Sequence, residues 1–529
     1  MGRLRSTARL ALERAESVFD ASFTPAWNPL YQLGALGWFF YWIVVATGIY
    51  LYIFFDTGVT DAYESVEYIT NVQWYAAGVM RSLHRYASDA LVVVMMLHLL
   101  REYILDRMRG PRWFAWVTGV PLLWMVFAAG LSGYWLVWDT LAQYVAVVTT
   151  EWLDTLPLFS QPIARNFLNE TTLSSRLFTL MVFIHIAVPL FMLFAMWVHI
   201  YRHSRPNVNP PRGLAAGTLA ALLILSLAQP AYSQGPANLG MVPAVVELDW
   251  FYLVVLPLTE HFSGGKVWMA LGIATLLLVI LPWLPPARRA PIAVVDLTNC
   301  NGCRRCYDDC PYGAVSMGPR TDGAVFEQQA VVNPDLCVSC GICTGACPTA
   351  TPFRRRSALR AGIELPALPV DTLREICLDA AGALGGNDRV MVFGCEHGSE
   401  IETLKNDSVG VIRLPCIAML PPSFIDFLIS RRHVEGVLLS GCRDGDCYYR
   451  LGIPWTRQRI AGERDPYLRK RVPHERLASC WVGLDRTPAL HAELEAFRER
   501  LGELPSKRDE ADPAARAKTD EREETASHA

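Results

Sequence analysis

The stretch SLHRYASDALVVVMMLHLLR, residues 82–101, places His84 and His98 fourteen residues apart in a largely apolar segment. Fourteen residues of α-helix rise about 21 Å and complete about four turns, so both imidazoles lie on one face at different depths. A second apolar segment repeats this interval with His185 and His199. Because an imidazole in hydrocarbon needs a partner, the pattern predicts that His84 pairs with His185 and His98 with His199. Each pair could bind a haem iron axially, giving an outer and an inner haem.

Glycines repeat the same interval on two neighbouring apolar segments. They are Gly34 with Gly48, and Gly119 with Gly133. Because glycine has no side chain, it would let a flat macrocycle approach the helix backbone closely. The alternative is that each histidine hydrogen-bonds a neighbouring helix and each glycine serves helix packing. That alternative does not explain why the same fourteen-residue interval recurs in four apolar segments. His203 has no partner at this spacing and is expected at the membrane interface.

The composition favours a membrane protein in the first half of the chain. Hydrophobic residues make up 52% of the 529 residues and charged residues 19%, with a formal net charge of −3. This balance gives no reason to expect a nucleic-acid partner. Six apolar segments are long enough to cross a bilayer. They lie at 34–55, 80–105, 115–138, 176–203, 213–231 and 266–284. The apolar run at 249–258 is too short to cross and is expected in the interface.

Charged residues between the spans predict the orientation of the chain in the membrane. Arginines flank the side of the bundle that we assign to the cytoplasm, namely Arg3, Arg5, Arg9, Arg14, Arg101, Arg107, Arg109, Arg112, Arg202, Arg205, Arg212, Arg288 and Arg289. Acidic residues follow the first span instead, namely Asp56, Asp61, Glu64 and Glu67. The positive-inside rule then places both termini in the cytoplasm of a bacterial or archaeal inner membrane. Residues 1–29 read as a basic amphipathic segment without a cleavable signal.

All fourteen cysteines lie between residues 300 and 480, and eight of them form two runs spaced C-x2-C-x2-C-x3-C-P. This spacing is typical of bacterial ferredoxins with two 4Fe–4S clusters, in which the fourth cysteine of each run binds the other cluster. The predicted ligands are Cys300, Cys303, Cys306 and Cys347 for the first cluster and Cys337, Cys340, Cys343 and Cys310 for the second. Zinc is the alternative, but it needs four ligands per site without this interlacing.

Residues 370–485 read as an α/β domain, with short buried strands at 389–395, 409–416 and 435–442. Four cysteines lie at or just after the ends of these strands, namely Cys395, Cys416, Cys442 and Cys447. Strand ends gather at one edge of a sheet, so four thiolates could converge there on a 2Fe–2S centre. Cys377 and Cys480 lack such spacing and are expected as core thiols. Residues 486–529 read as a short helix and a disordered, charged tail.

These patterns together predict the fold class and the domain order. We expect a multidomain chain with an all-α transmembrane bundle of six spans, an α+β ferredoxin domain and a small α/β iron–sulfur domain. The expected boundaries are 1–29, 30–212 for the dihaem core, 213–290 for a two-helix extension, 291–356 for the ferredoxin domain, 370–485 for the α/β domain and 486–529 for the tail.

Residues 30–212 resemble the cytochrome b of quinol-oxidising bc and bf complexes, and residues 213–290 resemble the start of subunit IV of the bf type. SLHRYASDALVVVMMLHLLR, GYWLVWD and RLFTLMVFIHIAVPLFMLFAMWVHIYRH carry the likeness. The resemblance implies that Arg81 and Arg101 pair with haem propionates, and that the protein is a homodimer. Gln32 stands where the bf type has a cysteine that tethers an extra haem, so we expect no covalent haem.

The resemblance also implies a quinone site at the outer face of the membrane. The family's Pro-Glu-Trp-Tyr motif corresponds to Leu248-Asp249-Trp250-Phe251 in this chain. Asp249 would move a quinol proton on a shorter side chain, and Trp250 and Phe251 would contact the quinone. The alternative is an interfacial acid beside an aromatic belt.

The run GVLLSGCRDGDCYYRLG, residues 436–452, resembles the delta subunit of methyl-viologen-reducing hydrogenase. That family carries a 2Fe–2S cluster and passes electrons to the flavin subunit of heterodisulfide reductase. Relatives have more cysteines near the first strand, where this chain has only Cys395. The resemblance implies a cytoplasmic flavin-containing partner.

The expected function is that of a membrane-bound electron-transfer subunit of a dehydrogenase:quinone oxidoreductase. It would relay electrons between a cytoplasmic flavoprotein, of heterodisulfide-reductase, NAD(P)H or hydrogenase type, and the quinone pool. One alternative is a membrane docking module that recruits a soluble redox complex, and another is quinol-driven reverse or bifurcating electron transfer to low-potential acceptors. No Gly-x-Gly-x-x-Gly run follows a strand, so substrate oxidation is expected in a partner subunit.

Overall fold

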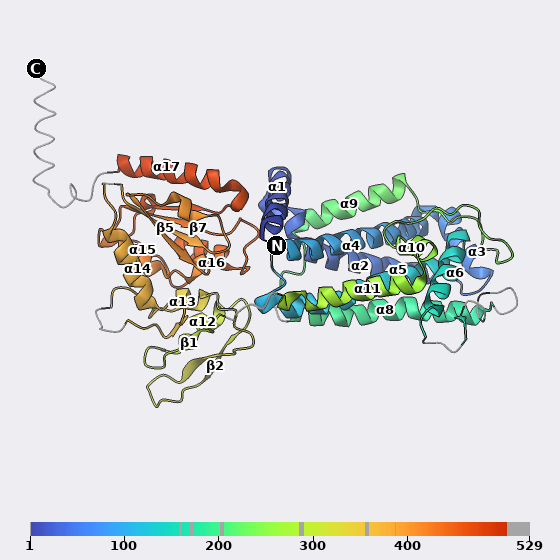
Figure 1. The fold of residues 1–529 in the computed structure, drawn as a ribbon, viewed down its shortest axis with the longest axis horizontal. Helices are drawn as coiled ribbons and strands as arrows, with labels where there is room; N and C mark the ends of the chain where they lie inside the picture. Colours follow the sequence, from blue (N-terminus) through green and yellow to red (C-terminus); the bar gives the residue numbers. More distant parts are fainter. Residues whose placement is uncertain are drawn as a thin grey trace, which may run out of the picture. The chain divides into compact units, whose positions relative to one another are not determined.

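A computed structural model describes residues 2–157, 161–163, 166, 168, 173–201, 206–284, 290–354, 359–386 and 388–504. These residues belong to two compact units, Met1–Arg289 and Ala290–Ala529 (Figure 1). Some predicted features lie outside the described residues, namely Arg202, His203, Arg205, Arg288, Arg289 and the tail beyond residue 504.

The described part of the first unit is helical. Its helices are α1 (Gly2–Trp27), α2 (Leu33–Tyr52), α3 (Asp61–Glu67), α4 (Val79–Ile104), α5 (Trp113–Val137), α6 (Thr140–Asp154), α8 (Ser175–Tyr201), α9 (Arg212–Ala228), α10 (Val255–His261) and α11 (Gly264–Ile280). The helices α2, α4, α5, α8 and α11 run alongside one another (Figure 1). The closest packing joins α2 to α4 and α5 to α8. This pairing sets each helix that carries a histidine pair against a helix that carries the predicted glycines.

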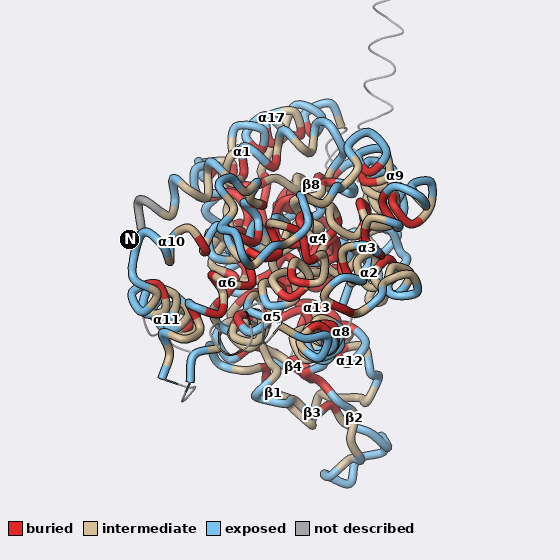
Figure 2. The backbone as a smooth tube through the Cα atoms, turned by 90° about the vertical axis from the view of Figure 1, so that its right-hand side faces the viewer, coloured by how far each residue is buried: buried red, intermediate tan, exposed pale blue. Residues whose placement is uncertain are grey.

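Four of the described helices are long and apolar enough to cross a membrane. They are Leu33–Tyr52, Trp113–Val137, Ser175–Tyr201 and Gly264–Trp283. Helix α8 exposes Phe183, Phe191 and Trp197, and α8 and α11 are exposed over much of their surface (Figure 2). A helix that is apolar on all sides is typical of a membrane span.

The two remaining predicted spans, in α4 and α9, are not among the helices that are long and apolar enough to cross a membrane, for different reasons. Helix α4 has 26 residues but includes the charged residues Arg81, Arg85, Asp89 and Arg101. Helix α9 is apolar but has only 17 residues. The chain is a membrane protein by its apolar helices, whereas a bundle of six spans stays a prediction.

The second unit begins with the cysteine-rich segment. Strands β1 (Val294–Val295) and β4 (Ile363–Glu364) pair antiparallel, as do β2 (Val315–Pro319) and β3 (Gln328–Val332). Two single-turn helices, α12 (Arg305–Asp308) and α13 (Ile342–Ala346), each carry one of the predicted cluster cysteines, Cys306 and Cys343.

The rest of the second unit is an α/β fold with a parallel sheet in the order β6-β5-β7-β8. The elements are α14 (Val370–Gly382), β5 (Val390–Cys395), β6 (Val409–Leu414), α15 (Pro422–Ser430), β7 (Gly436–Ser440), α16 (Gly452–Ala461), β8 (Leu477–Cys480) and α17 (Thr487–Glu503). The three predicted strands are confirmed, and β8 is a fourth strand that the sequence did not predict.

Both faces of the sheet are buried, in keeping with parallel strands that read as continuous apolar runs. Met391 and Phe393 of β5 point into the larger core, whereas Val390 and Val392 belong to a second core that includes Leu494 and Phe497 of α17. The helix that follows residue 486 is therefore part of this fold (Figure 1).

Candidate functional site

The structure brings the outer histidines together. The ring centres of His84 on α4 and His185 on α8 lie 6.3 Å apart, with their planes 61° from one another. Two imidazoles bound to opposite sides of one iron would have ring centres about 6 Å apart, since each metal–nitrogen bond is about 2 Å and each nitrogen lies roughly 1 Å from its ring centre. The pair therefore fits an iron between its rings. His98 and His199 also lie close enough to interact electrostatically.

The outer histidines are anchored through Nδ1. His84 Nδ1 lies 3.0 Å from the carbonyl oxygen of Val44 and 3.0 Å from Thr47 Oγ1. His185 repeats this arrangement, with Nδ1 3.0 Å from the Ala129 carbonyl and 3.3 Å from Ser132 Oγ. A carbonyl can only accept, so Nδ1 carries the proton. The lone pair of Nε2 is then available for a metal, which is the usual second-shell arrangement for a metal-binding histidine.

The sequence analysis did not predict the hydroxyl groups that contact the histidines, although the residues that carry them follow a pattern in the sequence. His199 Nδ1 lies 3.3 Å from Thr118 Oγ1. Each of the three hydroxyl residues directly precedes one of the predicted glycines, in the pairs Thr47-Gly48, Thr118-Gly119 and Ser132-Gly133. Gly34 follows Leu33 instead, and its partner His98 has no such hydroxyl from that position. The two histidine pairs therefore differ in how their imidazole rings are held.

Each predicted glycine faces a histidine ring of the neighbouring helix. A Cβ atom built on Gly133 would lie 2.8 Å from His185 Cε1, and one on Gly48 would lie 3.1 Å from His84 Cε1. The corresponding distances are 3.2 Å from Gly119 to His199 and 3.6 Å from Gly34 to His98. The glycines thus leave room for the imidazoles themselves, and contact with a macrocycle stays a prediction.

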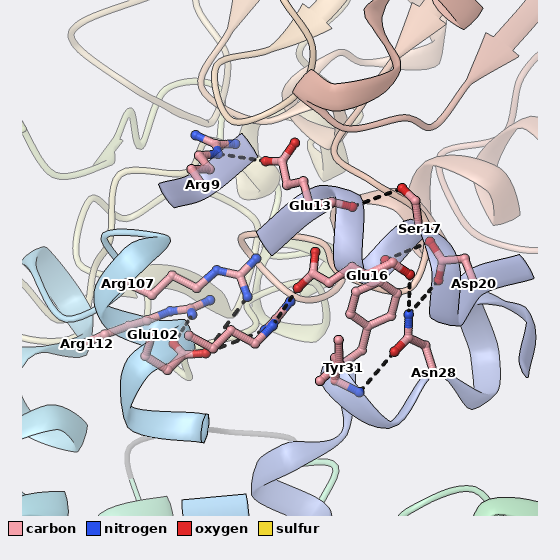
Figure 3. Close-up of polar contacts among 12 residues, drawn as sticks. Arg9, Glu13, Glu16, Ser17, Asp20, Asn28, Tyr31, Glu102, Arg107 and Arg112 are labelled. Atoms are coloured by element: carbon pink, nitrogen blue, oxygen red, sulfur yellow. Dashed lines mark hydrogen bonds and ion pairs between the residues drawn. The ribbon is translucent and has the colours of Figure 1, made fainter. Parts of the chain in front are cut away.

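The two arginines expected at haem propionates have protein partners in the structure. Arg81 donates to Thr70 Oγ1 and, over 3.0 Å, to Ser233 Oγ. Arg101 forms a buried ion pair with Glu16, 2.8 Å long, beneath the Tyr31 ring. Figure 3 shows Glu16 and Tyr31 in the N-terminal segment, facing charged residues at the end of α4 and just beyond it, namely Glu102, Arg107 and Arg112. A role in binding propionates stays a prediction for both arginines.

Asp249 lies in a buried polar cluster and not at an open surface. Its side chain accepts hydrogen bonds from Tyr134 of α5 and from the backbone N–H of Phe251, the latter 2.8 Å long. Arg85 of α4 lies 3.2 Å from the same carboxylate and 3.4 Å from Asp89. The neighbouring rings of Trp250 and Phe251 are 67% and 48% exposed. A buried acid beside exposed aromatic rings is compatible with the predicted quinone site but does not test it.

The eight ferredoxin-type cysteines line two separate cavities in the predicted interlaced grouping. One cavity is lined by Cys300, Cys303, Cys306 and Cys347, and the other by Cys310, Cys337, Cys340 and Cys343. Among the described residues, no three His, Cys, Asp or Glu side chains converge closely enough for one metal ion. Each thiolate of a cubane binds a different iron atom, so the four sulfur atoms around a cluster lie farther apart than the ligands of a single metal ion.

Burial affects the protonation of the thiols in these cavities. Burial, with a smaller contribution from neighbouring thiols, raises the pKa of Cys306 to about 12, and burial likewise raises the pKa of Cys340 to about 12. Thiolates are therefore costly here without a cation. Bound iron would reverse this cost, because a metal ion supplies the largest local positive charge.

The four cysteines of the α/β domain lie near one another, and their binding of a 2Fe–2S centre stays a prediction. The sulfur atoms of Cys395 and Cys442 are 3.6 Å apart, and the Cys442 and Cys447 side chains are hydrogen-bonded. A Cβ atom on Gly452 would lie 2.6 Å from Cys416 Sγ and 3.3 Å from Cys447 Sγ. Gly452 therefore keeps space open beside two of the thiols.

The two other cysteines lie apart from these sites. Cys377 is fully buried in the core on α14, and burial raises its pKa to about 12. Cys480 lies on β8, partly exposed, with a pKa raised to about 11 mainly by burial.

One buried cluster joins the second ferredoxin-type site to the third cysteine site. It contains Cys340 of the former and Cys416 of the latter, with the rings of Tyr312, Tyr449 and Trp455 around them. The two sites are therefore direct neighbours within the second unit.

Comparisons with known proteins agree with this division. The family model for cytochrome b/b6/petB matches residues 18–204, and the model for 4Fe-4S dicluster domains matches residues 299–351. The model for the delta subunit of methyl-viologen-reducing hydrogenase matches residues 400–505, which begin just after Cys395. A solved structure titled "Hyperthermophilic respiratory Complex III" is 20% identical, with a TM-score of 0.40, over 48% of this chain and 75% of that chain. The chain thus carries, in order, segments similar to cytochrome b, to 4Fe–4S dicluster domains and to the hydrogenase delta subunit, and these indicate a membrane protein of electron transfer.

Proposed function

We propose that this chain is the membrane subunit of a dehydrogenase:quinone oxidoreductase, and that it relays electrons between a cytoplasmic flavoprotein and the quinone pool. The observation that carries the proposal is the presence, on one polypeptide, of a histidine pair at iron-binding separation and of two interlaced cysteine groups. A partner similar to the flavin subunit of heterodisulfide reductase is our first choice.

The residues that would hold the cofactors follow from the site geometry. His84 with His185 and His98 with His199 hold two b-type haems, and the two ferredoxin-type cysteine groups hold two 4Fe–4S clusters. Cys395, Cys416, Cys442 and Cys447 hold a 2Fe–2S cluster. When bound, these groups supply one-electron transfer. The protein orients the imidazoles through their Nδ1 hydrogen bonds and shields the thiolates from water.

The order of the cysteine sites defines a route within the second unit. Cys340 and Cys416 belong to one buried cluster, so the third site is a neighbour of the second cubane site. The first cubane site includes Cys303, which is exposed. We infer that electrons pass between a partner, the third site, the second cubane site and the first cubane site, in that order.

The quinone end of the relay would use the buried acid. Asp249 accepts a proton from a quinol, or returns one to a quinone, while Tyr134 and Arg85 orient its carboxylate. The exposed rings of Trp250 and Phe251 offer an apolar surface for the quinone ring. With both termini in the cytoplasm of an inner membrane, this site lies on the outer face, and a homodimer is the expected assembly.

Rapid mixing of the purified full-length protein with reduced methyl viologen tests the proposal. We expect haem absorbance to change as electrons arrive through the cysteine sites, and Cys416→Ala to slow that change. Cys377→Ala is the matched control, because Cys377 lies in no cysteine site. A protein without any reducible b-type haem would instead favour a docking module.

A further inference from the structure

Arg459 is a buried cation at the junction of the second cubane site and the third cysteine site. Its side chain is only 1% exposed. One guanidinium nitrogen donates to the carbonyl oxygen of Ala418 over 2.8 Å, and another donates to Asp309 Oδ2 over 2.5 Å. Ala418 lies two residues after Cys416, and Asp309 directly precedes Cys310. The arginine thus contacts the chain next to a ligand of each site.

Gly345 packs closely against both the Arg459 guanidinium and the Ala418 carbonyl. A Cβ atom on Gly345 would lie 2.0 Å from the Ala418 carbonyl oxygen and 2.8 Å from the Arg459 guanidinium. Gly345 belongs to the turn of α13 between Cys343 and Cys347. The backbone that carries cubane ligands therefore lies directly on the segment that carries Cys416.

Two arginines and one aspartate meet at this junction. Arg464 also pairs with Asp309, with Nε 2.8 Å from Oδ1, and its guanidinium lies 4.4 Å from the centre of the Trp455 ring. Two arginines face one aspartate, so one positive charge is not neutralised within the group. Arg459 interacts electrostatically with Cys416 as well. The charge of Arg459 is weakly screened because its side chain is buried.

We propose that Arg459 is a positioning residue that holds a fixed positive charge between the second cubane site and the third cysteine site, and so raises the reduction potentials of both centres. The inference rests on the proposed function, because it needs iron–sulfur clusters at these sites. A nearby positive charge stabilises the reduced form, which carries one more electron. The two potentials are thereby shifted in the same direction, and electron exchange across the junction stays balanced.

Redox titration of the full-length protein, followed by electron paramagnetic resonance, tests this assignment. Arg459→Gln should lower the potentials of the second cubane and the third centre. Arg459→Lys keeps the positive charge but loses the planar guanidinium that bonds both Ala418 and Asp309. The potentials of both centres in this variant should therefore stay close to those of the wild type. Asp309→Asn removes the compensating negative charge and should shift both potentials upward. The control is Arg389→Gln, which breaks the Arg389–Glu435 pair before β5 and β7, at the ends of these strands away from the cysteines.

The signs of these shifts separate an electrostatic role from a structural one. If Arg459→Gln and Asp309→Asn shift the potentials in the same direction, or neither shifts them while iron content is kept, the proposal is wrong. If both variants lose iron, the potentials of Arg464→Gln test the proposal instead. Arg464 is more exposed than Arg459 and pairs with the same aspartate. It should lower both potentials by a smaller amount, and unchanged potentials would overturn the proposal. Absence of cluster signals from the wild-type protein would instead refute the proposed function.

Discussion

Replacing the four glycines that face histidines by alanine should impair haem binding in a graded order. The new Cβ atom would lie 2.8 Å from His185 in Gly133→Ala, 3.1 Å from His84 in Gly48→Ala, 3.2 Å from His199 in Gly119→Ala and 3.6 Å from His98 in Gly34→Ala. Ordinary contact begins at 3.4 Å. The His185 ring must therefore move by about 0.6 Å, whereas His98 need not move at all.

The displacement at His185 is large compared with the geometry that it disturbs. A movement of about 0.6 Å away from α5 would lengthen the 3.0 Å contact between His185 Nδ1 and the Ala129 carbonyl to about 3.6 Å, which is no longer a hydrogen bond. Overpacking of this kind costs about 1–3 kcal/mol, which corresponds to about 5- to 150-fold weaker haem binding. Alanine also favours the helix by about 1 kcal/mol relative to glycine, so unfolding alone should not explain a loss of haem.

Haem content per purified chain, measured from the pyridine haemochrome spectrum, reports the order directly. Gly272→Ala on α11 is the matched control, because nothing lies within 4 Å of its new Cβ atom. We expect the loss to decrease from Gly133→Ala through Gly48→Ala and Gly119→Ala to Gly34→Ala. Full haem content in Gly133→Ala would refute the reasoning. An equal loss in Gly34→Ala would show that the macrocycle, and not the imidazole, requires these glycines.

Three further predictions concern the quinone site, a haem ligand and a core thiol. Asp249→Asn should slow quinone turnover by about 10²–10⁴-fold, as expected for loss of a proton acceptor, with haem content unchanged; turnover at the wild-type rate would remove Asp249 from the mechanism. Thr47→Val removes one hydrogen bond to His84 Nδ1, worth about 1 kcal/mol, and so makes His84 a weaker donor to ferric iron. The reduction potential of the outer haem should therefore rise by at most about 40 mV. A lower potential in a spectroscopic redox titration would contradict this. The pKa of Cys377 is about 12 in the folded chain against 9.0 for an ordinary thiol, so the folded state binds more protons between these values and stability falls as pH rises above about 9. Thermal unfolding of Cys377→Ala should show a weaker decline over that range, and an unchanged decline would exclude this thiol as its cause.

The histidine pairs and the cysteine groups could be predicted because their geometry is fixed by short-range rules. The fourteen-residue interval and the inferred direction of the two helices placed His84 and His185 at one level, and ferredoxin spacing alone interlaced Cys310 and Cys347. The two cavities group the cysteines in that way. The strands before Cys395 and Cys442 were recognisable as apolar runs.

Other features depend on contacts between distant parts of the chain, and no local pattern reports them. Arg459 meets Asp309 across 150 positions, and Asp249 meets Tyr134 across 115. Strand β8 has only four residues and forms because β7 offers a parallel edge. The hydroxyls of Thr47 and Ser132 were accessible in principle, since each precedes a glycine at the fourteen-residue interval, but their role needs the neighbouring histidine in place.

Haem and iron analysis of the purified full-length protein, combined with low-temperature electron paramagnetic resonance, tests the central claim most directly. The account predicts two low-spin b-type haems per chain, each with two histidine ligands, together with signals from two 4Fe–4S clusters and a third iron–sulfur centre. A preparation that contains zinc in place of iron, or whose membrane part binds no haem, would contradict it.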